Sequence, residues 1–388
     1  MVRLAVIGGA LQGMELAYLA RKAGYETVVV DRDPGAPALN LGDHREIIDP
    51  LMDPMSLMNI ISDCDAVVPA NENIMLLNSL VGLTKAAEVP FLFDIDAYRI
   101  TSSKIQSNQM FTELGIKSPH EWPRCGFPAV VKPSSCSGSK GFRVVKTPDE
   151  LHDALHYVSE IGHEPVVQKF LSGRNLSLEA IRDGTTSTTY LTTEILLDDR
   201  YDCKGVFCSP NLVSEEVEEK LQEYSVKIAD QLGLSGLMDV EAVMDEGEPH
   251  LLEVDARFPS QTPAAILHAS GVNLLDELYS ILIEGGQPRK PKRGFSLYEH
   301  FTSVNGLLRS CGEKRFSSVH APEIIPGFYG CDEAITDYRV GCQKWSAAIM
   351  ISGQNEEEIL TRRRDCIARM MADNGLSIYI DPKPAEAL

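Results

Sequence analysis

Two short runs, MDVEAV (residues 238–243) and LEVDAR (residues 252–257), flank the turn sequence DEGE (residues 245–248). Two runs of alternating residues joined by such a turn predict a β-hairpin. Side chains alternate along a strand, so the acids of each run share a face. These acids are Asp239, Glu241, Glu253 and Asp255, and the intervening Val240, Leu252 and Val254 are expected to face the core.

If the two acidic faces align, up to four carboxylates converge on one small surface. Two unit charges 4 Å apart repel by roughly 4 kcal/mol at an effective dielectric near 20. Such a cluster therefore needs solvent, protonation or a bound cation, and Mg²⁺ suits oxygen ligands beside a phosphate. The alternative is a solvated outer sheet face that happens to carry several charges.

The composition describes a soluble globular protein with a net negative charge. The chain has 388 residues, with 36 Lys and Arg against 56 Asp and Glu, so its formal charge is −20. That balance argues against nucleic acid or an anionic membrane as the main partner. Nine scattered cysteines without a C-x-x-C spacing favour a reduced, cytoplasmic setting. The apolar start at residues 4–11 is too short to span a bilayer, so no targeting segment is expected.

The first 97 residues alternate predicted strands with predicted helices, which is typical of a doubly wound parallel sheet. The loop GGALQG (residues 8–13) follows the first strand but fits a dinucleotide-binding motif poorly, because Ala10 stands where the second glycine is needed. Asp31 ends the next strand, where a ribose-binding acid could lie. The sequence therefore supports nicotinamide binding less well than a second interpretation, in which substrate or effector binds at this edge of the sheet.

The middle of the chain carries groups suited to a nucleoside triphosphate. Lys104 opens a predicted helix, Lys132 ends a predicted strand, and a small-residue loop at residues 137–141 follows it. Lysines provide point charges for phosphate oxygens, and such a loop can fold its backbone N–H groups around phosphates. The loop is not a Walker loop, because G-x-x-x-x-G-K-[ST] is absent. The order of these elements before the acidic hairpin predicts a phosphate and metal site.

With these elements in place, residues 98–285 resemble the ATP-grasp superfamily of carboxylate–amine ligases. The matching text is PAVVKPSSCSGSKGFRVV (128–145), VVQKFLSGRNLSLEAI (166–181) and GLMDVEAVMDEGEPHLLEVDARFPSQTPAA (236–265). The resemblance implies an α/β protein with three parts. These are an N-terminal doubly wound domain (1–97), a central ATP-grasp domain (98–288) whose lid spans about 123–172, and a small C-terminal α+β domain (289–388).

The resemblance also implies roles for individual residues. Phosphates would be bound by Lys104 and Lys132 beneath the loop residues Ser137, Gly138 and Ser139; adenine and ribose by Gln168, Lys169, Phe170, Leu171 and Asn175; and Mg²⁺ by Glu241, Glu253 and Asp255, with Asp239 replacing or supporting Glu241. Lys132 and Arg257 would be the catalytic cations. Three positions depart from the family pattern: the third metal ligand is usually Asn, and Gln168 and Asn175 stand where acids are common.

A narrower resemblance, to the pyrrolysine-biosynthesis ligases, covers GGALQGMELAYLARKAGYETVVVD (8–31), VVPANENI (67–74) and LEVDARFPSQTP (252–263). It implies that ATP activates 3-methyl-D-ornithine as an acyl phosphate, which the ε-amine of L-lysine then attacks. The activated carboxylate would lie beside Arg257, Ser260, Gln261 and Thr262. Glu72 is a candidate partner for a substrate amine, with a helix cap as its alternative. His268 is a further candidate, with a satisfied core histidine as its alternative.

Three other hypotheses stay open. One is a different ATP-grasp ligase or carboxylase that acts on another small amino acid or a purine-pathway metabolite. The second is a nicotinamide-dependent oxidoreductase, which would need to bind its cofactor at the N-terminal glycine loop. The third is a nucleotide-binding sensor without turnover. The oligomeric state is also open, and related ligases often form homodimers.

Overall fold

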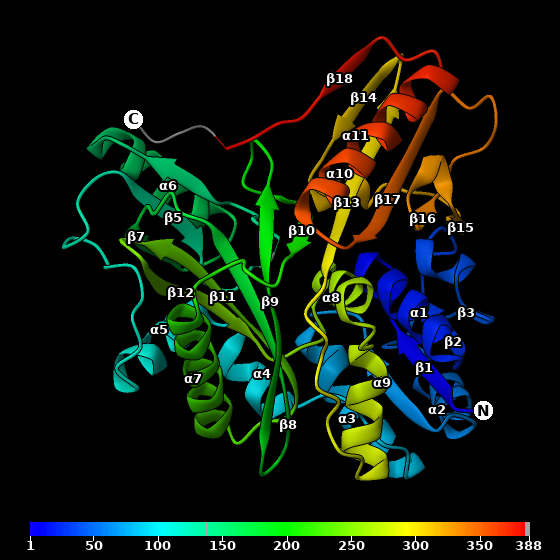
Figure 1. Cartoon of the computed structure of the whole chain (residues 1–388). Helices are drawn as coiled ribbons and strands as arrows, with labels where there is room; N and C mark the ends of the chain where they lie inside the picture. Colours follow the sequence, from blue (N-terminus) through cyan, green and yellow to red (C-terminus); the bar gives the residue numbers. More distant parts are fainter. Residues whose placement is uncertain (137, 385–388) are drawn as a thin grey trace.

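The computed structural model describes residues 1–136 and 138–384. The chain is an α/β protein built on three sheets, which confirms the predicted fold class (Figure 1). A parallel sheet begins the chain, a small antiparallel sheet forms a lid at the upper left of Figure 1, and a large sheet runs through the middle. The active-site candidates lie where these three parts meet.

The N-terminal sheet is parallel and has the strand order β3-β2-β1-β4. Its strands are β1 (Arg3–Ile7), β2 (Glu26–Asp31), β3 (His44–Ile47) and β4 (Ala66–Pro69); its helices are α1 (Leu11–Ala23), the 3-10 helix η1 (Pro37–Asn40), α2 (Pro54–Ser62) and α3 (Ile74–Ala87). Alternate residues of β1 enter two different cores, with Leu4 and Val6 in the core of α1 and Ala5 and Ile7 in the core of α2 and α3. The sheet is therefore covered on both faces, as expected for a doubly wound domain.

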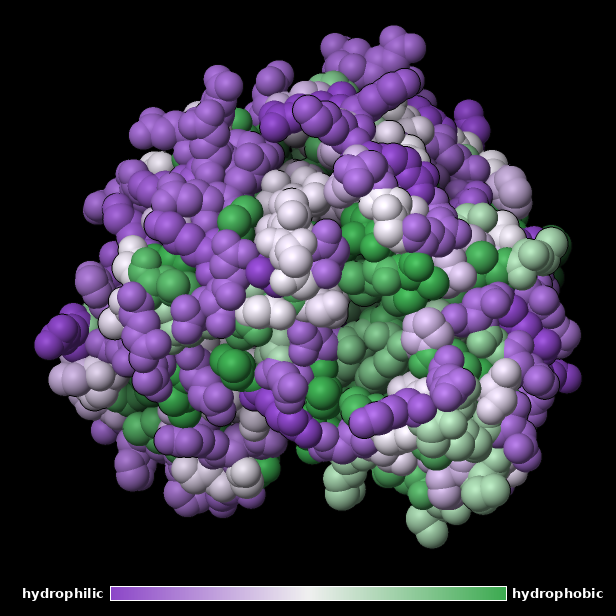
Figure 2. Space-filling model, turned by 90° about the horizontal axis from the view of Figure 1, so that it is seen from below, coloured by the Kyte–Doolittle hydropathy of each residue, from purple (hydrophilic) through white to green (hydrophobic). Residues whose placement is uncertain are grey.

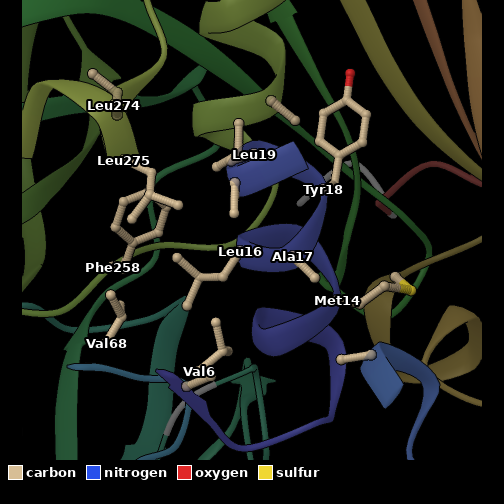
Figure 3. Packing of buried hydrophobic residues seen from close by; sticks show 14 of the residues in the cluster. Val6, Met14, Leu16, Ala17, Tyr18, Leu19, Val68, Phe258, Leu274 and Leu275 are labelled. Atoms are coloured by element: carbon tan, nitrogen blue, oxygen red, sulfur yellow. The ribbon is translucent and has the colours of Figure 1, made fainter. Parts of the chain in front are cut away.

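Helix α1 joins the N-terminal sheet to the rest of the molecule. Figure 3 shows Leu16 and Leu19 of α1 close to Phe258, Leu274 and Leu275, all of which are buried. Burying a side chain of this size contributes roughly 1.5–3 kcal/mol. This shared core fixes the glycine loop before α1 against the segment that follows the acidic hairpin.

The lid is a three-stranded antiparallel sheet with the order β6-β5-β7. Its elements are β5 (Ala129–Pro133), β6 (Arg143–Val145), α6 (Pro148–Glu160) and β7 (Pro165–Lys169), and helices α4 (Ile95–Thr101) and α5 (Lys104–Glu113) precede it. Val131 and Val145 pack against Leu151, Ala154 and Val158 of α6 in a small core of their own. The lid is thus packed as a separate unit beside the large sheet.

The large sheet has eleven strands, in the order β12-β11-β8-β9-β10-β13-β17-β16-β15, and β14 and β18 extend it from β13. The strands are β8 (Asn175–Asp183), β9 (Ser187–Leu197), β10 (Cys203–Cys208), β11 (Ser235–Asp245), β12 (Glu248–Asp255), β13 (Phe295–Val304), β14 (Leu307–Ser310), β15 (Glu323–Pro326), β16 (Glu333–Thr336), β17 (Lys344–Gly353) and β18 (Ile378–Ile380). The helical segments are α7 (Glu215–Leu232), α8 (Thr262–Ser270), α9 (Leu274–Tyr279), the π-helix η2 (Ser280–Glu284), α10 (Glu313–Phe316), η3 (Phe328–Gly330) and α11 (Glu356–Asp373).

The large sheet crosses the predicted boundary at residue 288. Strand β10 pairs with β13 from Gly205 opposite Glu299 to Cys208 opposite Ser296, so the C-terminal strands continue the sheet that carries the acidic hairpin. The limits 1–97, 98–288 and 289–388 stay a prediction. What matters for the site is that the connection from β14 to α10 returns to the same cleft as the hairpin.

The visible surface is mainly hydrophilic. Seen from below, hydrophilic residues cover much of the molecule, and hydrophobic residues gather near the middle and to the right (Figure 2). Within the described part of the chain, none of the helices combines the length and apolar character that crossing a bilayer requires.

Candidate active site

The predicted hairpin is present, and its register brings the acids together. Asp239 lies opposite Asp255, and Glu241 lies opposite Glu253. The turn has positive φ at both central residues, Glu246 (51°) and Gly247 (82°). Such a turn matches the twist of the flanking strands and fixes the pairing between β11 and β12.

One expectation about the hairpin is wrong. The pairing shifts after Glu241, so Ala242 lies opposite Leu251 and Leu252 becomes an extra residue in a β-bulge. Leu251, not Leu252, is buried in the core. A bulge bends its strand and leaves one residue out of the ladder. Here it presents the Leu252 carbonyl oxygen to Lys132, whose Nζ donates to it at 3.3 Å.

Two lysines lie beside Glu253. Lys104 Nζ is 2.7 Å from Glu253 Oε2 and donates to the Cys136 carbonyl oxygen at 2.9 Å. Burial alone would raise the pKa of Glu253, but the charges of Lys104 and Lys132 outweigh it and lower that pKa to about 2. Burial, together with the charge of Lys104, lowers the pKa of Lys132 to about 8, against the opposing effect of Glu253. Both lysines are therefore mainly protonated at pH 7, and their positive charges face the same space.

Burial and mutual repulsion destabilise the ionised forms of the other acids of the hairpin. Burial, with the charges of Glu253 and Asp255, raises the pKa of Glu241 to about 8. Burial, with the charge of Asp255, also raises the pKa of Asp239, whose Oδ1 atom is buried without a hydrogen-bond partner. A divalent cation would relieve this repulsion, so the donor set fits Mg²⁺ chemically.

No three His, Cys, Asp or Glu side chains among the described residues are arranged to hold a metal by themselves. Mg²⁺ usually binds through one or two carboxylates and completes its shell with water and substrate phosphates. The hairpin fits that partial role, because Glu241 and Glu253 are paired across the strands. Protein carboxylates and phosphate oxygens would together coordinate the ion.

Arg257 follows β12 and is held between two acids. Its Nε is 3.1 Å from Glu72 Oε1, and its Nη2 is 3.1 Å from Asp255 Oδ2. Burial opposes the charge of Arg257, but Asp255 and Glu72 more than offset it and raise the pKa of the guanidinium. Glu72 comes from the loop between β4 and α3, so the N-terminal sheet reaches the same site as the hairpin.

A cleft of about 1070 Å³ joins these groups. Its lining includes most of the predicted site residues: Glu72, Lys104, Lys132, Gly138, Ser139, Gln168, Lys169, Phe170, Leu171, Asn175, Asp239, Glu241, Glu253, Arg257, Ser260, Gln261 and Thr262. Asp255 is not part of the lining but contacts Arg257, which is. Ser137 lies outside the described residues. The volume is of the size that ligand pockets commonly have.

The end of the cleft beneath the lid is apolar and aromatic. Phe170 and Leu171 line it together with Ile195, Leu197 and Val243 from the large sheet. Tyr201 packs against Phe170 with ring centroids 5.9 Å apart. Apolar walls of this kind suit a flat base, and the backbone of residues 168–171 borders the same space.

His268 lies away from the cleft lining. Its Nε2 is 2.8 Å from Tyr18 Oη and 3.2 Å from Glu333 Oε1, and its Nδ1 is 3.7 Å from Asp332 Oδ2. Burial would lower its pKa, but Asp332 and Glu333 outweigh burial and raise it. These partners match the alternative of a satisfied core histidine, so we do not carry His268 forward as a substrate residue.

The N-terminal glycine loop also borders the cleft, through Ala10, Leu11 and Gln12. Both carboxylate oxygens of Asp31 accept backbone hydrogen bonds, from Gly9 N at 2.6 Å and Asp33 N at 2.8 Å. Asp31 therefore shapes the loop through both of its carboxylate oxygens. Because the loop borders the same cleft as the acidic hairpin, substrate binding at this edge of the sheet fits the structure better than a separate dinucleotide site.

Sequence reasoning missed Glu313, which lies on α10 and also lines the cleft. Gln261 Nε2 donates to Glu313 Oε2 at 3.1 Å. Gln261 has φ 72° and ψ −53°, and the next residue's N–H donates to Ser260 O at 2.8 Å, which makes a strained γ-turn. No local pattern marks Glu313, because its role depends on a long-range return of the chain.

The lid, the large antiparallel sheet and the acidic hairpin define an ATP-grasp ligase, and residues 101–261 match the ATP-grasp domain family. The chain is 36% identical over 320 residues to a 3-methyl-D-ornithine--L-lysine ligase of Methanosarcina acetivorans, covering 82% of this chain and 84% of that protein. A second ligase of the same name, from Methanosarcina mazei, is 34% identical over 81% of this chain and 82% of its own length. The chain belongs to the 3-methyl-D-ornithine--L-lysine ligase family.

A solved structure shares the fold at much lower sequence identity. The ADP complex of an N5-carboxyaminoimidazole ribonucleotide synthetase has a TM-score of 0.71 and 15% identity, and the match covers 96% of this chain and 97% of that one. The similarity therefore extends beyond the residues matched to the ATP-grasp domain and includes the N-terminal and C-terminal parts.

Proposed function

We propose that the protein joins the carboxylate of 3-methyl-D-ornithine to the ε-amine of L-lysine. The reaction consumes ATP and releases ADP and phosphate. Support comes from the two Methanosarcina relatives that carry this name at 36% and 34% identity over most of the chain. The cleft is also large enough for a nucleotide beside small substrates.

In this proposal the nucleotide lies between the lid and the large sheet. Lys104, Lys132, Gly138 and Ser139 would contact its phosphates, and the segment 168–171 with Asn175 would border its base and ribose. Glu241 and Glu253 would hold Mg²⁺, with Asp239 and Asp255 beside them. When bound, the ion would neutralise charge on the phosphate oxygens.

The observation that carries the proposal is the placement of cations and acids in one cleft. Lys104 pairs with Glu253 at 2.7 Å, and Arg257 pairs with both Glu72 and Asp255 at 3.1 Å. Arg257, with Ser260, Gln261 and Thr262, would orient the substrate carboxylate toward the terminal phosphate. Lys132 and Arg257 would then stabilise the charge that develops on the transferred phosphoryl group.

The chemistry has two steps. A carboxylate oxygen attacks the terminal phosphorus, so an acyl phosphate forms and ADP leaves. The lysine amine then attacks the acyl carbon, the C–N bond forms, and phosphate departs. Glu72 lines the cleft, so its carboxylate, which already pairs with Arg257, would also receive a substrate ammonium group that stays charged during the reaction.

The test is mass spectrometry of products after incubation with ATP, Mg²⁺ and pooled amino acids that include 3-methyl-D-ornithine, ornithine and lysine. We expect one ADP per amide, with the mass of the ornithine derivative joined to lysine. Lys132→Ala should abolish the product, whereas Lys146→Ala, at an exposed lysine after β6, should not. A product built from other metabolites, or none at all with ATP bound, would refute the proposed reaction.

We also place this reaction in the cytoplasm. All nine cysteines are free thiols, which supports a reduced compartment. The oligomeric state is open between a monomer and a homodimer, and light scattering of the purified protein distinguishes them.

A further inference from the structure

Glu313 is brought into the cleft from the C-terminal part of the chain. It is the first residue of α10, directly after Gly312. Gly312 N donates to Asp198 Oδ2 at 3.1 Å, and Lys314 N donates to Asp202 Oδ2 at 3.1 Å. The turn between β9 and β10 thus fixes the backbone on both sides of Glu313, which lets its carboxylate stay in one place.

The carboxylate lies between two segments already assigned to the reaction. Its Oε2 accepts from Gln261 Nε2 at 3.1 Å, on the segment that follows the hairpin. Its Oε1 lies 2.8 Å from the point that a β-carbon on Gly138 would occupy, so it borders the phosphate loop of the lid. Glu313 therefore faces the region where the activated carboxylate and the phosphates would meet.

Apart from Asp239 and Glu241, which belong to the proposed Mg²⁺ site, the other acids near this region already have partners. Glu253 pairs with Lys104, while Glu72 and Asp255 pair with Arg257. Asp202 is only 5% exposed and holds the backbone of α10. Among the residues that the structure describes, Glu313 forms no ion pair, and its one side-chain hydrogen bond comes from a neutral amide. An acid placed in this way can still receive a cation.

The proposed reaction needs such an acid. A lysine side chain has an ordinary pKa of about 10.4, which is about 3.4 units above pH 7. Only roughly 1 amine in 2,500 is uncharged at that pH. The nitrogen lone pair must be free to attack the acyl phosphate, so a group at the cleft has to accept a proton from the ammonium.

We propose that Glu313 receives the ammonium group of the amine substrate and takes its proton, which makes Glu313 the general base of the amide-forming step. This inference rests on the proposed function and assigns a role to a residue outside the ATP-grasp segment 101–261. Gln261 orients Glu313 through its hydrogen bond and is a positioning residue.

Two protons leave the substrate nitrogen during amide formation. The ammonium gives one proton to the Glu313 carboxylate, and the neutral amine attacks the acyl carbon. The C–N bond forms, the bond from carbon to the phosphate oxygen breaks, and the departing phosphate takes the second proton from the nitrogen. Glu313 then releases its proton to water, so one amide and one hydrogen phosphate result.

The electrostatics of the site support this role. Burial and the charge of Asp202 raise the pKa of Glu313 to about 7, against the opposing effects of Arg257 and Lys314. A general base works best when its pKa lies near the working pH. The titratable and charged groups that face Glu313 are Asp202, Lys314, Arg257, Glu72, Glu15, Tyr298 and Cys203.

Hydroxylamine separates the two halves of the reaction, because it is largely uncharged at neutral pH and traps acyl phosphates as hydroxamates. With 3-methyl-D-ornithine and ATP, Glu313→Gln should form hydroxamate at the wild-type rate. With lysine as the amine, its kcat/KM should fall about 100-fold. The wild type should show a rise in lysine kcat/KM as the pH passes about 7, and Glu313→Gln should lose that limb.

Two variants complete the test. Glu313→Asp keeps a carboxylate and should restore part of the lysine rate, whereas Glu323→Gln removes an exposed acid elsewhere and should change nothing. A Glu313→Gln protein that uses lysine as well as the wild type, or that loses hydroxamate and amide formation equally, overturns the inference. A wild type that forms no ATP-dependent hydroxamate refutes the proposed function, and the inference falls with it.

Discussion

Replacing Glu241 with glutamine should make the metal-free, nucleotide-free protein more stable at neutral pH. The side chain keeps its shape, so the change removes only the ability to ionise. In the folded protein, burial and the charges of Glu253 and Asp255 raise the pKa of Glu241 from 4.5 to about 8. The unfolded chain has no such environment, so this group ionises there more readily than in the fold.

The sign and size follow from proton linkage. A carboxyl group with a raised folded pKa binds more protons when folded, so its stability cost grows as the pH rises from 4.5 to about 8. At pH 7 the gap from 4.5 is 2.5 units, which corresponds to about 3 kcal/mol at 1.36 kcal/mol per unit. Glu241→Gln should raise the free energy of unfolding by about that much at pH 7 and should leave it unchanged well below pH 4.5.

Glu253→Gln is the matched control with the opposite sign. Burial opposes the ionised form of Glu253, but Lys104 and Lys132 prevail and lower its pKa from 4.5 to about 2. Its stabilisation is complete above pH 4.5 and is lost as the pH falls through about 2. Because 23% of this side chain is exposed, we expect a loss of about 2–3 kcal/mol at pH 7.

The assay is urea unfolding in EDTA at several pH values, followed by the transition midpoint with the slope checked for constancy. Glu241→Gln should move the midpoint up and Glu253→Gln should move it down. Both variants should need far more Mg²⁺ for turnover. If Glu241→Gln is less stable than the wild type at pH 7, or if the difference in stability does not change with pH, then the fold does not raise the pKa of Glu241.

Four further outcomes are expected. Lys132→Ala should stop ADP release while circular dichroism stays unchanged, since the cation acts on the phosphoryl group; wild-type turnover would contradict its placement. Arg257→Lys should lower kcat about 100-fold, because one ammonium cannot replace the two directed contacts of the guanidinium; equal rates would contradict it. His268→Gln should cost about 3 kcal/mol of stability at pH 6 but much less once the pH exceeds the raised folded pKa, and should spare kcat; equal costs at both pH values would contradict it. Finally, Mg²⁺–ATP binding at pH 7 should release protons, less so in Glu241→Gln, as calorimetry in buffers of different ionisation enthalpy can measure; an unchanged release would contradict it.

The hairpin shows what a local pattern can predict. Alternation along residues 238–243 and 252–257 sets which side chains share a face, and the turn sets the register, so the pairing of Glu241 with Glu253 could be expected. The bulge at Leu252 could not, because the extra residue is defined only by its partner strand. An alternating pattern predicts which face of a strand each side chain occupies, but it does not predict where a bulge inserts an extra residue.

His268 and Glu313 show the opposite limit. His268 follows the predicted substrate segment by only a few residues, yet α8 directs it toward Tyr18 and Glu333, which lie far away in the sequence. Glu313 is separated from Gln261 by 52 residues and reaches it only through the pairing of β10 with β13 and the return to α10. Contacts of this kind depend on tertiary packing, and no local motif encodes them.

The residues expected to bind the nucleotide and those expected to select the amino acids come from different parts of the sequence. This difference bears on substrate specificity. The groups expected to act on the nucleotide, from Lys104 to Arg257, lie within the stretch that matches the ATP-grasp domain family. The groups expected to select the amino acids include Glu72 from the N-terminal sheet and Glu313 from the C-terminal part, both of which reach the cleft from outside that stretch. Since function belongs to sites placed on a fold, the same architecture can persist at 15% identity while these outer contributions change. We therefore expect exchange of substrates to follow substitutions near Glu72 and Glu313 rather than in the acidic hairpin.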